Sequence, residues 1–185
     1  MKLKPGQVLD EFRVGEHEVV FRLPKRGDEV GCMRHINRLV RDRVYIGRQK
    51  RVTIAEERKF MRDAMKALGK GGSILVVVTL DGEIAGSGSV RTSKARWNAH
   101  IAGLGIALSR GRGMGIGTRL MKLLIKLARE HFRVRIIRLS TAGRNKVAQK
   151  LYRKVGFREC GRIPKGFSWY GEYMDEILMY KPLRR

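Results

Sequence analysis

The chain of 185 residues has few of the features that mark secreted, membrane-spanning or metal-binding proteins. Its two cysteines, Cys32 and Cys160, cannot build a disulfide framework, and neither belongs to a CxxC pair. The longest apolar run, residues 74–80, is far too short to cross a bilayer. The first residues lack the apolar stretch and cleavage site of a secretory signal, and the histidines show no metal-ligand spacing. The sequence therefore predicts a reduced, cytoplasmic protein that holds no metal and does not enter a membrane.

Acidic residues are also scarce, since 17 Asp and Glu stand against 41 Lys and Arg, which gives a formal net charge of +24. Such a field concentrates anions, including nucleic acid and phosphorylated cofactors. A solvated basic surface explains the charge equally well, and the presence of only three Asn and three Gln favours a thermophilic source. Aromatic residues make up 7% and are not interleaved with the basic clusters, which argues against a single-strand stacking platform. Electrostatic association with nucleic acid or the ribosome is therefore the alternative function.

The pattern of elements predicts one domain, residues 17–185, preceded by a poorly patterned N-terminal lead-in, residues 1–16. The Asp81-Gly82 turn predicts a hairpin, and helical spacing with Asp28 and the Thr53–Glu56 capping box predicts two early helices. Helices are expected at 28–43, 53–69, 116–130 and 145–155, and strands at 19–23, 73–80, 83–91, 98–108, 134–139, 156–163 and 175–180. The order β-α-α-β-β-β-α-β-α-β-β predicts a mixed α/β sheet with helices packed on its faces.

A glycine-rich segment, residues 108–118, joins an expected strand to an expected helix, and its four glycines alternate along the chain. Missing Cβ atoms let a ligand approach the backbone, and the free N–H groups of a helix N-terminus attract anions. Arg110 and Arg112 add donors suited to phosphate. The segment fits neither GxxxxGK[ST] nor GxGxxG, which argues against a kinase, an NTPase or a Rossmann dehydrogenase. The simpler alternative is a glycine loop that only turns a corner.

The segment Arg112-Gly-Met-Gly-Ile-Gly117 resembles the acetyl-CoA signature [RQ]xxGx[GA] of the GNAT superfamily of N-acetyltransferases. Residues 145–157, with Asn145, Ala148, Leu151-Tyr152 and Gly156-Phe157, are similar to the downstream segment of that family, and residues 171–179 are similar to its closing strand. The resemblance implies an α/β (α+β) fold with a mixed, largely antiparallel twisted sheet of six to seven strands flanked by about four helices. Two departures are a linker of only three residues between Leu108 and Arg112, and no Glu on the fourth strand as general base.

The resemblance also implies an activity: acetyl-CoA, as cosubstrate, gives its acetyl group to a primary amine by direct attack in a ternary complex. The acceptor amine is not identified, and a homodimer is common in similar proteins. By resemblance, Leu108 offers the oxyanion N–H and Ile106 binds the pantetheine amides. The residues expected around the cosubstrate are Ile106, Ala107, Leu108, Arg110, Arg112, Gly113, Met114, Gly115, Ile116, Gly117, Thr118, Asn145, Ala148 and Tyr152.

Five side chains are candidates for the chemistry or for binding. Tyr152 resembles the family's proton donor to the leaving thiolate, and the alternative is that it only completes the apolar stripe of its helix. Asn145 either binds the pantetheine arm or is a plain helix N-cap. His100 is the nearest titratable group to the expected position of the base, although a lone histidine there is more often a surface residue. Glu172 and Asp175 are weaker candidates for holding the acceptor amine.

Overall fold

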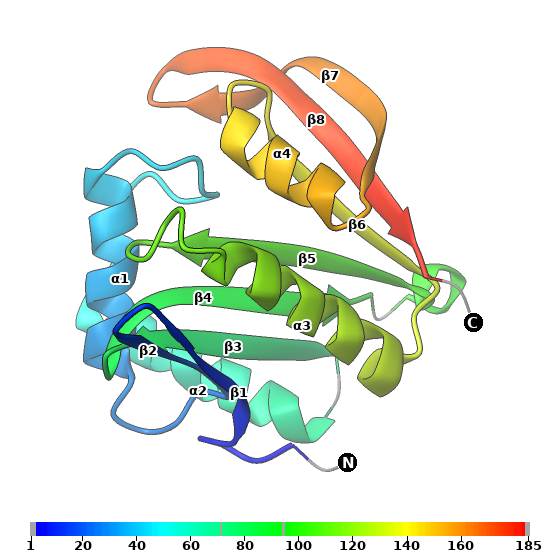
Figure 1. The fold of residues 1–185 in the computed structure, drawn as a ribbon. Helices are drawn as coiled ribbons and strands as arrows, with labels where there is room; N and C mark the ends of the chain where they lie inside the picture. The colour runs from blue at the N-terminus through cyan, green and yellow to red at the C-terminus, as the bar shows by residue number, and fades with distance from the viewer. Residues whose placement is uncertain (1–2, 71, 94, 184–185) are drawn as a thin grey trace.

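The computed structural model describes residues 3–70, 72–93 and 95–183, which form one twisted sheet with helices on both faces (Figure 1). The sheet has eight strands in the order β1-β2-β3-β4-β5-β6-β8-β7, and all neighbours are antiparallel except β5 and β6. The strands are β1 (Val8–Val14), β2 (His17–Arg22), β3 (Ser73–Leu80), β4 (Glu83–Thr92), β5 (Ile101–Leu108), β6 (Ile136–Ala142), β7 (Arg158–Trp169) and β8 (Glu172–Pro182). The predicted fold class is confirmed, but the predicted count of six to seven strands is wrong.

The additional strand is β1, which lies within the residues that the sequence predicts as an unpatterned lead-in. It pairs with β2 at the edge of the sheet, and its side chains are exposed or half-buried. Leu9, Phe12 and Val14 pack on the core. An edge strand with polar residues between these positions shows no clean alternation, which explains why the sequence does not reveal it.

The helices are α1 (Glu29–Arg41), α2 (Ile54–Lys70), α3 (Ile116–Phe132) and α4 (Lys146–Lys154). Helices α1 and α2 cover one face of the sheet, and α3 and α4 cover the other (Figure 1). Because both faces are covered, nearly every residue of β3 is buried. The capping box is confirmed, with Thr53 N–H donating to Glu56 and Glu56 N–H donating to Thr53. Asp28 makes no side-chain cap and instead accepts two 2.7 Å hydrogen bonds from Arg22.

The divergence of β5 from β6 creates the site. The two strands pair only where Ile101, Ala102 and Gly103 lie beside Ile136, Ile137 and Arg138. Beyond Gly103 they separate, while β5 stays paired with β4 as far as Leu108 (Figure 1). The register of β4 and β5 continues without a shift, so no bulge interrupts this ladder. The free edge of β5 arises from the divergence of the strands.

Candidate active site

The open edge of β5 carries free main-chain N–H groups. Ser109 N–H donates to Ala85 O on the β4 side, and His100 O accepts from Arg135 N–H on the β6 side. Because successive residues of a strand direct their polar groups to opposite sides, the N–H groups of Ile106 and Leu108 face the gap toward β6. Ala107 directs its own N–H toward β4. An extended amide-bearing chain lying in the gap could therefore pair with β5 as a strand does.

The glycine loop has room for a ligand beside its backbone. Gly111, Gly113 and Gly115 have φ of 69°, 84° and 77°, in the left-handed region that glycine tolerates best. A Cβ added to Gly113 or Gly115 would meet nothing within 4 Å. Met114 and Ile116 anchor the loop by packing on the core. The loop therefore presents backbone, free of side chains, to the surrounding space.

The first turn of α3 completes an anion site. Gly115 is the N-cap, and the first intrahelical bond runs from Arg119 N–H to Gly115 O. The N–H groups of Ile116, Gly117 and Thr118 consequently have no partner within the helix. Such groups, at the positive end of the helix dipole, suit a phosphate or pyrophosphate.

The two arginines of the loop point in different directions. Arg112 turns back over β5, where its Nε donates a 2.8 Å hydrogen bond to Leu108 O. Arg110 instead forms an ion pair with Glu83 at the start of β4. Arg112 is thus the arginine that stays beside the strand end and the loop.

Helix α4 places Tyr152 in the gap. Its side chain is 7% exposed and lines the large cavity described below. Burial raises the pKa of the Tyr152 hydroxyl, so the group keeps its proton and can donate it. Asn145 is the N-cap of α4, since its Oδ1 accepts a 3.2 Å hydrogen bond from Ala148 N–H. The capping alternative for Asn145 is therefore confirmed, and only its side-chain N–H groups remain for a ligand.

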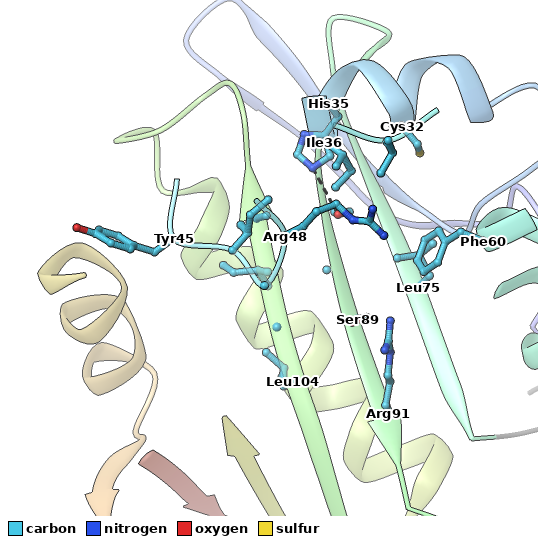
Figure 2. A pocket seen from close by; sticks show the side chains of 18 of the residues that line it. Cys32, His35, Ile36, Tyr45, Arg48, Phe60, Leu75, Ser89, Arg91 and Leu104 are labelled. Carbon is cyan, nitrogen blue, oxygen red and sulfur yellow. Dashed lines mark hydrogen bonds between the residues drawn. The ribbon is translucent and has the colours of Figure 1, made fainter. Parts of the chain in front are cut away.

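A cavity of about 480 Å³ lies on the α1–α2 face of the sheet and extends to Tyr152. Its floor consists of small residues on neighbouring strands, Ser87 and Ser89 on β4 beside Ala107 and Gly105 on β5. Figure 2 shows its wall, where α1, the connection after α1, and β3 to β5 meet. The small floor residues leave the room that a substrate needs.

Charged groups of both signs line this cavity. Arg48, from the α1–α2 connection, and Arg91, from β4, direct their side chains into the same region, beside Phe60 (Figure 2). Neither arginine makes an ion pair with any residue that the structure describes. Glu57 on α2 is 5% exposed, and burial raises the pKa of its carboxyl. The cavity thus offers a cationic region and a desolvated carboxyl group.

A second buried polar residue, His35 on α1, also lines the cavity. Its Nδ1 lies 2.8 Å from Ser109 Oγ, and its Nε2 lies 3.5 Å from Ser87 Oγ. Burial, followed by the charges of Arg112 and Arg38, lowers the pKa of His35 to about 4. Sequence reasoning missed His35 and Glu57, because a single His or Glu within an amphipathic helix carries no signal until the helix is placed on the sheet.

The other titratable candidates lie elsewhere. His100 is exposed before β5, and six residues of extended strand separate it from Ile106, about 20 Å along the sheet. It does not line the cavity, so the geometry does not support it as the base. Glu172 pairs with Arg144, and Asp175 accepts hydrogen bonds from Arg162 and Lys165. Both acidic residues are therefore engaged outside the cavity.

Hydrogen bonds from the β7–β8 hairpin hold the end of α1 and the α1–α2 connection, which border the cavity. The Tyr170 hydroxyl lies 3.0 Å from Val40 O and 3.2 Å from Gln49 O, and these two carbonyl oxygens share its single proton. Gln49 in turn donates to Ser168 O and accepts from Tyr170 N–H. These bonds fix the connection that carries Arg48.

None of the described helices is long and apolar enough to span a membrane. No cluster of three or more His, Cys, Asp or Glu in the described part of the chain could hold a metal ion.

Known proteins share this fold. A curated L-amino acid N-acetyltransferase of Escherichia coli (strain K12) is 30% identical over 105 residues, which are 56% of this chain and 65% of that protein, so the match spans slightly less than two thirds of the relative. A GNAT-family acetyltransferase structure from Streptococcus pneumoniae is 23% identical, with a TM-score of 0.80 over 90% of this chain and 100% of that one. The yncA structure from Salmonella typhimurium, with its cofactor acetyl-CoA, is 18% identical, with a TM-score of 0.77 over 90% and 94%. Residues 41–157 match the Acetyltransferase (GNAT) family, and the chain therefore belongs to that family.

Proposed function

We propose that this protein is an N-acetyltransferase that moves the acetyl group of acetyl-CoA to the primary amine of a small acceptor bearing a carboxylate. One observation carries the proposal: a single cavity joins the open edge of β5 and Tyr152 to a buried carboxyl group and to two arginines that form no ion pair with any described residue. Donor and acceptor can therefore occupy the site together, which direct attack in a ternary complex requires.

The donor side has a separate group for each part of acetyl-CoA. The loop amides, the first turn of α3 and Arg112 suit the pyrophosphate. The N–H of Ile106 and the amide of Asn145 suit the pantetheine arm, and the N–H of Leu108 suits the oxyanion. The Tyr152 hydroxyl, kept neutral by burial, suits proton donation to the leaving thiolate.

The acceptor side supports an amino-acid-like molecule. A carboxylate binds well to paired guanidinium groups, and Arg48 and Arg91 are two such groups without a protein partner in the described residues. An ammonium group suits the Glu57 carboxylate, which is otherwise desolvated. The Escherichia coli relative named for L-amino acids supports the same class of acceptor.

Matched acceptors test this proposal. Amino acids and the amines formed by removing only their carboxyl group should be compared in initial-rate assays with acetyl-CoA. We expect the acids to have the lower KM, and Arg48→Gln and Arg91→Gln each to raise KM for the acids by roughly ten- to hundredfold but leave the amines unchanged. Arg13→Gln on β1, exposed at the far edge of the sheet, is the control. Equal KM values for acids and amines in the wild-type protein would remove the carboxylate from the proposal.

The net charge of +24 supports a second, separate proposal, electrostatic association with nucleic acid or the ribosome. A groove beside α3 and the end of β8 is lined by Lys122, Lys126, Arg129 and Lys181. Binding to RNA that weakens steeply between low and moderate salt would support this association, and no binding at low salt would exclude it. A cytoplasmic location, a homodimer, a thermophilic source and the division into 1–16 and 17–185 stay predictions.

A further inference from the structure

His35 is a buried polar residue that the roles above leave unused. Its side chain is 3% exposed, and it reaches from α1 to the ends of β4 and β5. Figure 2 shows its ring at the upper end of the cavity, above the strands. A buried imidazole that touches two serine hydroxyls is a group whose protonation state the surrounding structure controls.

The hydrogen bonds of Ser109 indicate the tautomer of His35. Ser109 Oγ lies 3.1 Å from Ala85 O, a carbonyl that can only accept, and we infer that the single hydroxyl proton is donated there. The Ser109 oxygen then accepts the proton of His35 Nδ1, at 2.8 Å. Nε2 is left without a proton, and its lone pair faces the Ser87 hydroxyl at 3.5 Å. Contacts of this length between catalytic groups often tighten when substrates bind.

Ser87 lines the same cavity as Ile106 and Tyr152. It is on the cavity floor and pairs with Ala107 in the β4–β5 ladder. Neighbouring strands are about 4.8 Å apart, so Ser87 is one strand away from the free N–H groups of Ile106 and Leu108. Those N–H groups face the space where the thioester carbonyl is expected. The Ser87 hydroxyl lines the cavity that reaches this space and lies 3.5 Å from Nε2 of His35, so it can link the two.

We propose that His35 is the proton acceptor for the attacking amine, with the Ser87 hydroxyl passing the proton to Nε2; this inference rests on the proposed function. The amine nitrogen bonds to the thioester carbon, and the C–S bond breaks. One proton passes from that nitrogen to Ser87 Oγ as the Ser87 proton moves to His35 Nε2. Tyr152 gives its proton to the thiolate. The ammonium first releases one proton to solvent, which frees the lone pair for attack. Solvent then takes a proton from the imidazolium and restores one to Tyr152, so the overall reaction releases one proton for each ammonium acetylated.

The charges around His35 make its basicity depend on the cofactor site. Its pKa of about 4 reflects burial first, then Arg112 and Arg38, so the ring is neutral and able to accept at physiological pH. The other charged groups lining the same cavity are Arg48, Arg91, Glu56 and Glu57. When a phosphate group offsets the charge of Arg112, the pKa of His35 rises. The base is then strengthened only when the phosphates of the cofactor are in place.

Histidine variants and pH profiles test the role. His35→Gln should lower kcat by roughly 10²–10⁴-fold and leave the Kd for acetyl-CoA unchanged. Ser109→Ala, which frees the tautomer, should cause a smaller loss. The wild-type rate should show an acidic limb whose pKa stays constant across acceptors of different amine pKa and is missing in His35→Gln. His131→Gln, an exposed histidine on α3, is the control, and thermal melting verifies folding.

Nitrogen NMR of His35 gives a readout that needs no turnover. At neutral pH the proton should be on Nδ1, and added CoA should raise the pKa of His35 in the wild-type protein but not in Arg112→Gln. A proton on Nε2, or acetyl transfer by His35→Gln at the wild-type rate, would overturn the inference while the proposed function stands. A wild-type protein that neither binds acetyl-CoA nor acetylates any amine would overturn the proposed function instead.

Discussion

Arg112 Nε donates a hydrogen bond of 2.8 Å to the carbonyl oxygen of Leu108, which joins the glycine loop to the last residue of β5. This bond holds the guanidinium group beside both the free edge of the strand and the first turn of α3. Arg110, two residues earlier, is drawn to Glu83 instead. The loop therefore keeps one of its arginines beside the proposed cofactor site and directs the other to the β3–β4 hairpin.

Lysine substitutions should separate the two arginines. Arg112→Lys loses the Nε bond to Leu108 and the paired donors that suit a pyrophosphate. We expect its Kd for acetyl-CoA to rise by roughly tenfold. Arg110→Lys keeps a cation near Glu83, which is exposed, so we expect less than a twofold change. Isothermal titration measures both, and an equal loss in the two variants would contradict this division of roles.

Gly115→Val tests the open space beside the loop. A Cβ at this position meets no protein atom within 4 Å, so the valine side chain is expected to enter the volume assigned to the phosphates, and φ of 77° adds strain. We expect acetyl-CoA binding to be lost, with a stability cost of about 1–2 kcal/mol. Gly15→Val is the matched control, because Gly15 also has positive φ and open surroundings but lies in the β1–β2 turn. It should show the same stability cost with normal acetyl-CoA binding, and a Gly115→Val protein that binds normally would move the phosphate site elsewhere.

Tyr152→Phe removes the hydroxyl proton donor but keeps the packing of the aromatic ring. The ring of Tyr152 lies against Phe157, and a phenylalanine keeps that contact. We expect kcat to fall by roughly 10²–10³-fold while the Kd for acetyl-CoA changes less than threefold. Because burial raises the pKa of Tyr152, the wild-type rate should show no loss from tyrosine ionisation below its usual pKa of about 10. Similar pH–rate profiles and similar kcat values in the two proteins would leave Tyr152 a packing residue.

The sequence predicts the donor half of the site better than the acceptor half. The signature and the segment 145–157 are each one continuous stretch of sequence. Their glycines and helix caps shape only the backbone a few residues away, so local spacing determines the structure. The acceptor cavity is assembled from α1, α2, β4 and β5. His35 and Ser109 are 74 residues apart, and only the packing of α1 on the sheet brings them together.

The β7–β8 hairpin shows a second limit. Pro164 predicts the end of a strand at residue 163, but β7 continues to Trp169. Because β7 is the edge strand of the sheet and its register shifts between Ile163 and Phe167, the missing N–H of proline is tolerated. The extension supplies Phe167 to the cavity wall, and Tyr170, directly after it, bonds to Val40 O at the end of α1. The sequence therefore does not predict this part of the cavity wall, because proline usually ends a strand.

Glu57 should show a conflict between stability and acceptor binding. Burial raises the pKa of its carboxyl in the folded protein, so ionisation above the unfolded pKa of about 4.3 destabilises the fold, and that destabilisation disappears as the pH falls. Glu57→Gln removes it and should raise Tm by roughly 2–4 °C at pH 7 and by less at pH 4. The same change should raise KM for the acceptor, because the ammonium loses its counter-charge, while the Kd for acetyl-CoA stays the same. Melting curves at the two pH values, together with acceptor KM, decide the matter: a Tm gain that does not depend on pH would show that ionisation of Glu57 is not its cause.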